Sequence, residues 1–236
     1  MSFPIKNNVA QYVIEIPSTK EKVSFRPFLV GEHKNMMLAL ATEDIDNIVN
    51  SIKTIIELCS YGKVNPQKLA PFDIEYIFLQ LRAKSIGESV MLTTNCYNCE
   101  EQFNFSIDIS EAKVNFGDMI SNKIQITDDI GVELRYPTLE ETLILNSKDV
   151  VSDAVLQDAV SKCIVSIWDS SEFISAKDYP IEKIVEFMDT LTVTQMSQLT
   201  DFIILTPSVQ IIEDVDCPHC KEKNKIFIEG LENFFG

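Results

Sequence analysis

The chain has 236 residues, with 36 acidic side chains against 20 basic ones and a formal net charge of −16 at pH 7. Such a surface repels polyanions, so we expect it to bind neither nucleic acid nor an anionic membrane. Hydrophobic residues make up 45% of the chain, which is too many for an acidic disordered tail and enough for a full core.

No stretch reaches the roughly 18 apolar residues of a membrane span, and residues 1–6 lack the pattern of a signal peptide. We therefore expect the chain to stay in the reducing cytosol. There, its six cysteines are better read as thiols or metal ligands than as disulfides.

The first half of the chain predicts a hairpin, then helices, then a second hairpin. Residues 12–16 and 23–26 alternate at period two around a polar turn, which is typical of antiparallel strands. Apolar spacing and Pro71 predict helices at residues 32–41, 44–59 and 72–84. A CxxC sequence then lies between two expected strands, residues 89–94 and 102–109.

The second half repeats this order with little side-chain identity. Expected strands at residues 123–127 and 131–135 precede helices at 154–168, 181–189 and 195–205, and strands at 209–213 and 225–229 enclose a second CxxC. We predict an α+β fold of two pseudo-repeated halves of helices plus β-hairpins, residues 1–112 and 113–236, as two lobes or one compact domain.

Four cysteines form two CxxC pairs, Cys96 with Cys99 and Cys217 with Cys220. Thiolates at this spacing can bind zinc tetrahedrally, and each pair lies at the tip of an expected hairpin. Residues 100–216 separate the pairs, but equivalent hairpins of two pseudo-symmetric halves can face each other. We predict one structural zinc bound by all four cysteines, in a zinc-ribbon-like site that joins the halves.

Disulfides within each pair and thiol redox catalysis are the alternatives. The sequence from Cys217 to Cys220 has the dipeptide of some thiol oxidants, but in those proteins a helix follows, and here a charged turn and a strand follow. His219 is expected to be exposed, with ligation in place of a cysteine as the alternative. Cys59 and Cys163 lie on apolar helix faces, so we expect them to be buried. Phosphate-binding glycine loops and nucleophile elbows are absent from the sequence, so we expect no enzyme.

Two segments before the first CxxC carry a family resemblance: residues 25–32 read FRPFLVGE, and residues 72–88 read FDIEYIFLQLRAKSIGE. They resemble the baseplate hub subunit and hub-assembly proteins of T4-like contractile-tailed bacteriophages. The resemblance covers residues 20–112 well and the remainder more loosely.

This resemblance implies a non-enzymatic tail protein that builds or completes the central baseplate hub, as a subunit or as an assembly chaperone. Its partners would be other tail and hub proteins, in the virion baseplate or in the host cytoplasm during assembly. The aromatic end, Phe234 and Phe235, is either a latch into the core or an anchor for a partner. The alternative function is a CxxC thiol redox enzyme or a metal-dependent hydrolase.

Overall fold

The computed structural model describes residues 9–117, 121–146 and 152–230, so the predicted aromatic end lies outside the described residues. The chain forms two compact units. Unit 1 combines residues 1–68, 72–115 and 208–236, and unit 2 combines residues 69–71 and 116–207. Helices and small antiparallel sheets occur in both units, so the predicted α+β class is confirmed. The two pseudo-repeated halves stay a prediction.

Unit 1 begins with an antiparallel hairpin that leads into three helices. The hairpin pairs β1 (Tyr12–Glu15) with β2 (Lys22–Phe25). The helices are α1 (Val30–Leu40), α2 (Ile45–Cys59) and α3 (Pro71–Ser85), with a 3-10 turn at Pro66–Lys68. Asp44 begins α2 because its carboxylate accepts hydrogen bonds from the backbone N–H groups of Asp46 and Asn47.

Helix α3 passes through the core of unit 1. Phe72, Ile77 and Phe78 are almost completely buried. Asp73 is buried beside them, and its carboxylate accepts hydrogen bonds from the backbone N–H (2.9 Å) and the hydroxyl (2.5 Å) of Ser18. Ser18 lies in the turn between β1 and β2, so this buried carboxylate connects the first hairpin to α3.

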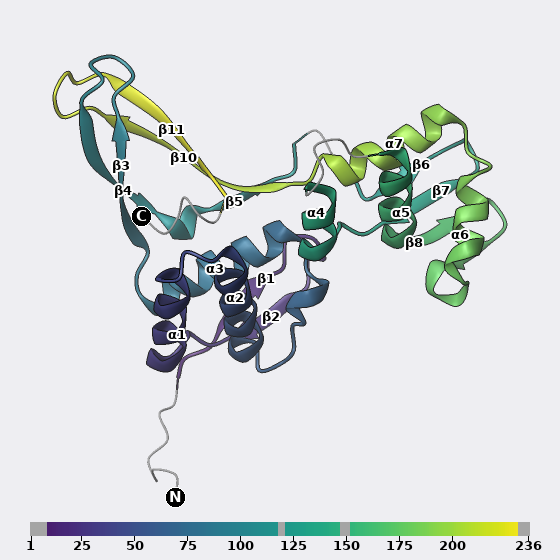
Figure 1. Cartoon of the computed structure of the whole chain (residues 1–236), viewed down its shortest axis with the longest axis horizontal. Helices are drawn as coiled ribbons and strands as arrows, with labels where there is room; N and C mark the ends of the chain where they lie inside the picture. Colours follow the sequence, from purple (N-terminus) through teal and green to yellow (C-terminus); the bar gives the residue numbers. More distant parts are fainter. Residues whose placement is uncertain (1–8, 118–120, 147–151, 231–236) are drawn as a thin grey trace, which may run out of the picture. The chain divides into compact units, whose positions relative to one another are not determined.

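Two longer hairpins complete unit 1. The strand β3 (Ser89–Asn95) pairs with β4 (Gln102–Asp108), and β10 (Ser208–Asp216) pairs with β11 (Lys223–Glu229). Two short elements follow β4 in the chain, a 3-10 turn at Ile109–Glu111 and β5 (Lys113–Asn115), which pairs with β10. The two hairpins lie side by side with their turns at the same end, although most of unit 2 separates them in the sequence (Figure 1).

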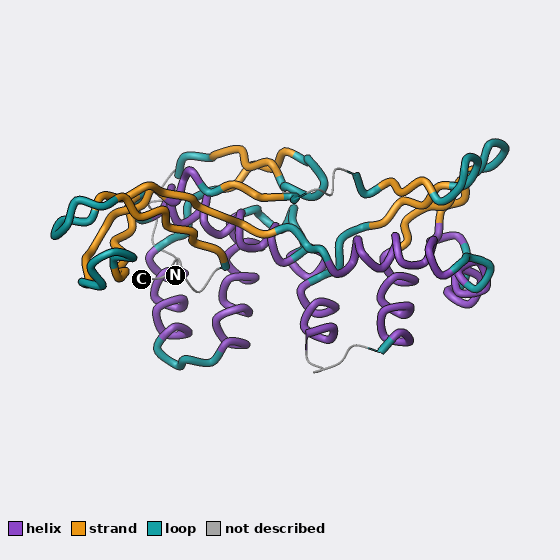
Figure 2. The backbone as a smooth tube through the Cα atoms, turned by 90° about the horizontal axis from the view of Figure 1, so that it is seen from above, coloured by secondary structure: helices purple, strands orange, loops and turns teal. Residues whose placement is uncertain are grey.

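The described residues of unit 2 form a four-stranded antiparallel sheet and four helices. The strands, in sheet order, are β6 (Lys123–Gln125), β7 (Gly131–Leu134), β8 (Ile164–Trp168) and β9 (Phe173–Ser175). The helices are α4 (Leu139–Asn146), α5 (Asp153–Cys163), α6 (Ile181–Met188) and α7 (Val193–Ile204), with a 3-10 turn at Ala176–Asp178. Figure 2 shows the helices on one side of the strands, where Val132, Leu199 and Phe202 belong to a shared core.

The helix predicted over residues 154–168 is wrong in its last five residues. Helix α5 ends at Cys163, and the chain continues directly into β8, which pairs with β7 and β9. Ile, Val and Trp side chains dominate this segment, and such residues favour a pleated surface once both neighbouring strands are present. The first half of the chain has no strand at the equivalent place, because α2 is followed by a turn and α3.

The connection from β2 to α1 and the connection from β7 to α4 share one set of contacts. Arg26 donates two hydrogen bonds to the Glu32 carboxylate (2.8 and 2.6 Å), and Arg135 donates two to Glu141 (both 2.8 Å). The backbone N–H of Arg26 also donates to the carbonyl of Cys59, the last residue of α2. In the same way, the N–H of Arg135 donates to the carbonyl of Cys163, the last residue of α5. The same spacing of Arg and Glu therefore builds the same junction twice.

Candidate metal centre

Each CxxC pair lies in a tight turn between antiparallel strands, and the two turns have the same conformation. In the first, the Cys96 N–H donates to the carbonyl of Glu101, and the Glu100 N–H donates back to the carbonyl of Cys96 (both 3.0 Å). The equivalent bonds of Cys217 measure 2.9 and 3.0 Å. The residue after the second cysteine is left-handed in both turns, with φ of 61° at Glu100 and 65° at Lys221. The two turns are therefore equivalent knuckles.

The structure brings the four knuckle cysteines together. The Sγ atoms of Cys96, Cys99, Cys217 and Cys220 all lie within 4.8 Å of one another. Between the knuckles, the sulfurs of Cys96 and Cys220 are 3.6 Å apart, and those of Cys99 and Cys217 are 3.7 Å apart. Four thiolates around zinc, each at about 2.3 Å, form a tetrahedron with an edge of about 3.8 Å. The arrangement therefore fits one zinc ion, with each knuckle contributing two ligands.

A buried amide connects the two knuckles. Asn224 on β11 is 0% exposed, and its side-chain oxygen accepts the backbone N–H of Tyr97 (2.9 Å). Its side-chain nitrogen donates to Cys96 Sγ (3.6 Å) and to the carbonyl of Glu222 (3.0 Å). Sequence reasoning missed this residue, and the only signal was a polar side chain at an inward position of an otherwise apolar alternation. Asn224 thus orients the Cys96 sulfur, as partners behind metal ligands commonly do.

The local hydrogen bonds favour one thiolate in the cluster. Backbone N–H groups of Cys99 and Asn98, together with the Asn224 amide, lower the pKa of the Cys96 thiol to about 6 despite its burial. The N–H of Glu101 acts in the same sense on Cys99, but burial and the neighbouring sulfurs outweigh it and raise the pKa of that thiol to about 12. Thiolates this close repel one another, and a divalent metal between them would offset that repulsion.

The remaining candidates from the sequence lie apart from this cluster. His219 is exposed and is not among the grouped ligands of the described residues. Cys59 and Cys163 are fully buried, as predicted, and burial raises the pKa of each thiol to about 12. Among the helices that the structure describes, none has the length and apolar character needed to cross a membrane.

The fold and the knuckles define a class of protein: an acidic α+β chain in which two distant hairpins meet at a four-thiol centre. The family model described as "T4 bacteriophage base plate protein" matches residues 9–236, and the chain belongs to this family. The family resemblance drawn from residues 25–32 and 72–88 is thereby confirmed.

One curated relative is the "Baseplate hub assembly protein gp26" of Enterobacteria phage T4. It is 20% identical over 225 residues, which cover 95% of this chain and 98% of the relative. No solved structure matches the chain.

Proposed function

We propose that this protein helps to build the central hub of a phage baseplate by binding other tail proteins, and that it catalyses no reaction. The observation that carries the proposal is the match to a hub assembly protein over nearly the whole length of both chains. The protein would act in the host cytoplasm during assembly or remain in the virion baseplate. A match over nearly the whole chain favours a shared role more than a match confined to one knuckle would. The surfaces that bind partner proteins can then be common to both proteins.

We further propose that Cys96, Cys99, Cys217 and Cys220 bind one structural zinc ion. The spacing of their sulfurs supports this, since it matches the edges of a tetrathiolate tetrahedron. With four protein ligands, the ion has no open position for a substrate, so its role is to hold the hairpins together.

The halves 1–112 and 113–236 would, on this proposal, derive from one duplicated unit. The equivalent knuckles and the equivalent arginine–glutamate junctions support a duplication, because both recur in the same order along the chain. The extra strands β8 and β9 in the second half would then be a later divergence.

The surface offers apolar side chains to partners. On α1, Val30 is 71% exposed and Leu38 is 67% exposed, and beside the knuckles Tyr97 is 73% exposed and Phe227 is 63% exposed. Single exposed apolar residues are common, but pairs on one helix and on adjacent hairpins favour contact with other proteins.

Complementation of a phage that lacks this gene tests the proposed function. Leu38→Glu and Tyr97→Glu should reduce the yield of complete baseplates in lysates while leaving the melting temperature of the purified protein within a few degrees. Lys34→Gln on the same helix is the control for Leu38→Glu, because both change the net charge by −1. If both surface variants complement fully and a knuckle cysteine variant that stays folded does not, the thiol redox alternative replaces the assembly role.

A further inference from the structure

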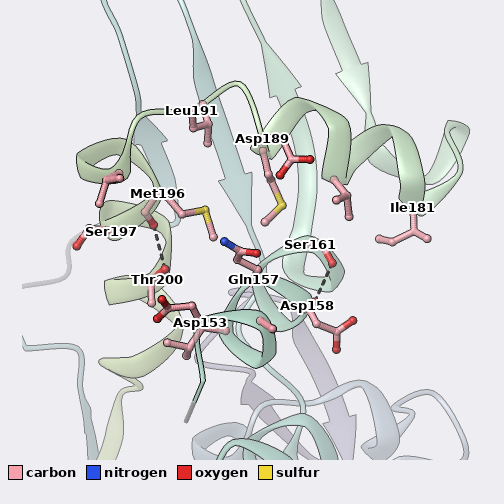
Figure 3. A pocket seen from close by; sticks show the side chains of 15 residues that line it. Asp153, Gln157, Asp158, Ser161, Ile181, Asp189, Leu191, Met196, Ser197 and Thr200 are labelled. Carbon is pink, nitrogen blue, oxygen red and sulfur yellow. Dashed lines mark hydrogen bonds between the residues drawn. The ribbon is translucent and has the colours of Figure 1, made fainter.

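Unit 2 carries a groove between α5, α6 and α7 that is open to solvent and has a volume of about 710 Å³ (Figure 3). One face of α6 lines it through Ile181, Val185 and Met188, which are spaced i, i+4 and i+7. The facing side of α7 contributes Val193, Met196 and Thr200, again at helical spacing. Faces of this kind are normally covered by another helix, because the ridges of one helix fit the grooves between its neighbours.

The walls of the groove combine apolar side chains with polar ones, among them Gln157 and Ser197. Ile181, Val185 and Val193 are 44%, 41% and 88% exposed. The hydroxyls of Ser161 and Thr200 donate to carbonyls of their own helices (2.8 and 3.0 Å), as the dashed lines in Figure 3 show. These hydroxyls do not require donors or acceptors from a ligand, so an apolar side chain can pack against them. Met188 and Met196 add flexible side chains that adapt to an incoming surface.

The charged groups of the groove are all negative. Its fifteen lining residues, all in the described part of the chain, include three carboxylates and no cation. In Figure 3, Asp189 lies at one edge of the groove, with Asp153 and Asp158 at the opposite edge. Lys162 on α5 pairs with Asp158, and Lys183 on α6 pairs with Glu186, so the negative charge that the groove offers to a partner comes mainly from Asp153 and Asp189.

We infer that this groove binds an amphipathic helix of a partner protein, with an apolar face flanked by lysine or arginine. The apolar side chains that line the groove at helical spacing complement the apolar face of such a helix, and the acidic edges attract its cations. A second copy of this chain is disfavoured as the occupant, because a protein with a net charge of −16 would bring further negative charge to an acidic rim. The inference deepens the proposed hub function, on which it rests, by naming a surface and the chemistry of its partner.

A designed peptide tests the groove directly. The probe is a fluorescent 14-residue helix of leucine and lysine, with leucine at i, i+3, i+4 and i+7, titrated with the full-length protein at low and high salt. We expect saturable binding that weakens as salt increases, and no binding of the same peptide with glutamate in place of lysine. Absence of binding by the lysine peptide, or equal binding of both peptides, would overturn the inference.

Matched variants separate the groove from the acidic surface in general. Asp153→Asn with Asp189→Asn should weaken binding by about fivefold or more, because two edge charges are lost. Glu182→Gln with Asp201→Asn is the control, since it removes two exposed charges from α6 and α7 outside the groove. Val185→Asp should also abolish binding, whereas Ile204→Asp, at an exposed position outside the groove, should not. Equal losses in the test and control variants would mean nonspecific attraction and would contradict the inference.

Complementation separates the inference from the proposed function. If Val185→Asp blocks baseplate assembly and Ile204→Asp does not, the groove is a hub contact. If Val185→Asp complements fully while Leu38→Glu does not, the hub function stands and the groove inference is wrong. If phage that lack the gene still form complete baseplates, the proposed function itself fails, whatever the peptide results.

Discussion

At the residue scale, Asn224 connects the two knuckles without being a metal ligand itself. It satisfies a backbone N–H from one knuckle and a carbonyl from the other, and it donates to Cys96 Sγ. Groups of this kind orient the ligands of a metal and limit how the site can relax. The stability of the site therefore depends on an uncharged residue outside the CxxC sequences.

Replacing Asn224 with alanine should loosen the site and lower stability. The change removes the partner of the part-buried Tyr97 N–H, which costs about 1 kcal/mol, the lower end of the range for a buried group. We expect zinc to be lost to a chelator at concentrations about 10–100-fold lower than for the wild type, the usual range for residues behind metal ligands. Asn98→Ala is the control, because Asn98 contacts Cys96 Sγ only through its backbone N–H, which alanine retains. Chelator titration followed by metal analysis measures both variants, and equal release would show that Asn224 does not support the site.

The half-buried carboxylate of Glu141, which pairs with Arg135, gives a pH-dependent contribution to stability. Burial opposes the ionisation of Glu141, but hydrogen bonds from Arg135 and from the Thr138 N–H outweigh it and lower the pKa from 4.5 to about 2. A carboxylate with a lowered folded-state pKa stabilises the protein above its unfolded pKa. This stability is lost as the pH falls from 4.5 towards 2.

Glu141→Gln should remove that part of the pH dependence. Urea unfolding followed by Trp168 fluorescence is a suitable measurement, since Trp168 is the single tryptophan of the chain and lies in unit 2 with the junction. At pH 6 the variant should unfold at lower urea than the wild type, and the difference should shrink between about pH 4.5 and about pH 2. A difference that stays constant over this range would show that the ionised carboxylate contributes nothing.

At the element scale, the pairing of β7 with β8 depends on a glycine. Gly131 lies opposite Trp168 in the sheet, and a Cβ atom at Gly131 would lie 2.1 Å from the indole ring. The ring thus occupies the space that any other residue would need. The opposite case is Gly31 in α1, where a Cβ would meet nothing within 4 Å.

The two glycines predict opposite outcomes for the same substitution. Gly131→Ala should destabilise unit 2 by about 1–3 kcal/mol, the usual cost of forcing a packed group to move. Gly31→Ala should stabilise α1 by up to about 1 kcal/mol, because alanine loses less backbone entropy in a helix. Urea unfolding of both variants by circular dichroism checks the signs, and tryptophan fluorescence should change only for Gly131→Ala. A neutral Gly131→Ala would show that the indole moves freely.

Local sequence patterns predict most elements of this fold, and the errors arise where distant pairing decides. Helix α3 and the two knuckle hairpins follow from apolar periodicity and turn residues. Residues 164–168 fit a helix and a strand equally well by periodicity, and only the partners β7 and β9 settle the choice. The three-residue strand β5 was missed for the same reason, since it exists only as the partner of β10.

The four cysteines of the candidate site could be predicted from the sequence, but their surroundings could not. The CxxC spacing marks four sulfurs directly, because the chemistry of zinc restricts both residue type and spacing. The contacts of Asn224 and the groove of unit 2 depend on which elements become neighbours, and the sequence carries no short-range signal for that. The apolar residues of α6 predict a buried face of a helix, whereas the structure leaves part of that face open.

At the scale of the whole molecule, a metal at the knuckles would join two segments that are far apart in the chain. Cys96 and Cys99 precede most of unit 2 in the sequence, and Cys217 and Cys220 follow all of it. A cross-link that closes a loop of about 100 residues restricts the unfolded chain by roughly 4–5 kcal/mol in the chain-entropy account of disulfides. A shared zinc should act in the same way, in addition to the intrinsic strength of its bonds.

A double-mutant cycle on the cysteines tests whether the two knuckles share one ion. Cys96→Ser and Cys217→Ser should each lose the zinc, measured as metal per chain, and should each lower the free energy of unfolding by several kcal/mol. The double variant should be little worse than either single variant, because the first substitution has already removed the shared interaction. Two separate CxxC sites would instead give additive losses, with half of the metal or thiol reactivity changed by each substitution. Additive effects would therefore contradict the shared centre, while retained zinc in either single variant would remove that cysteine from the ligand set.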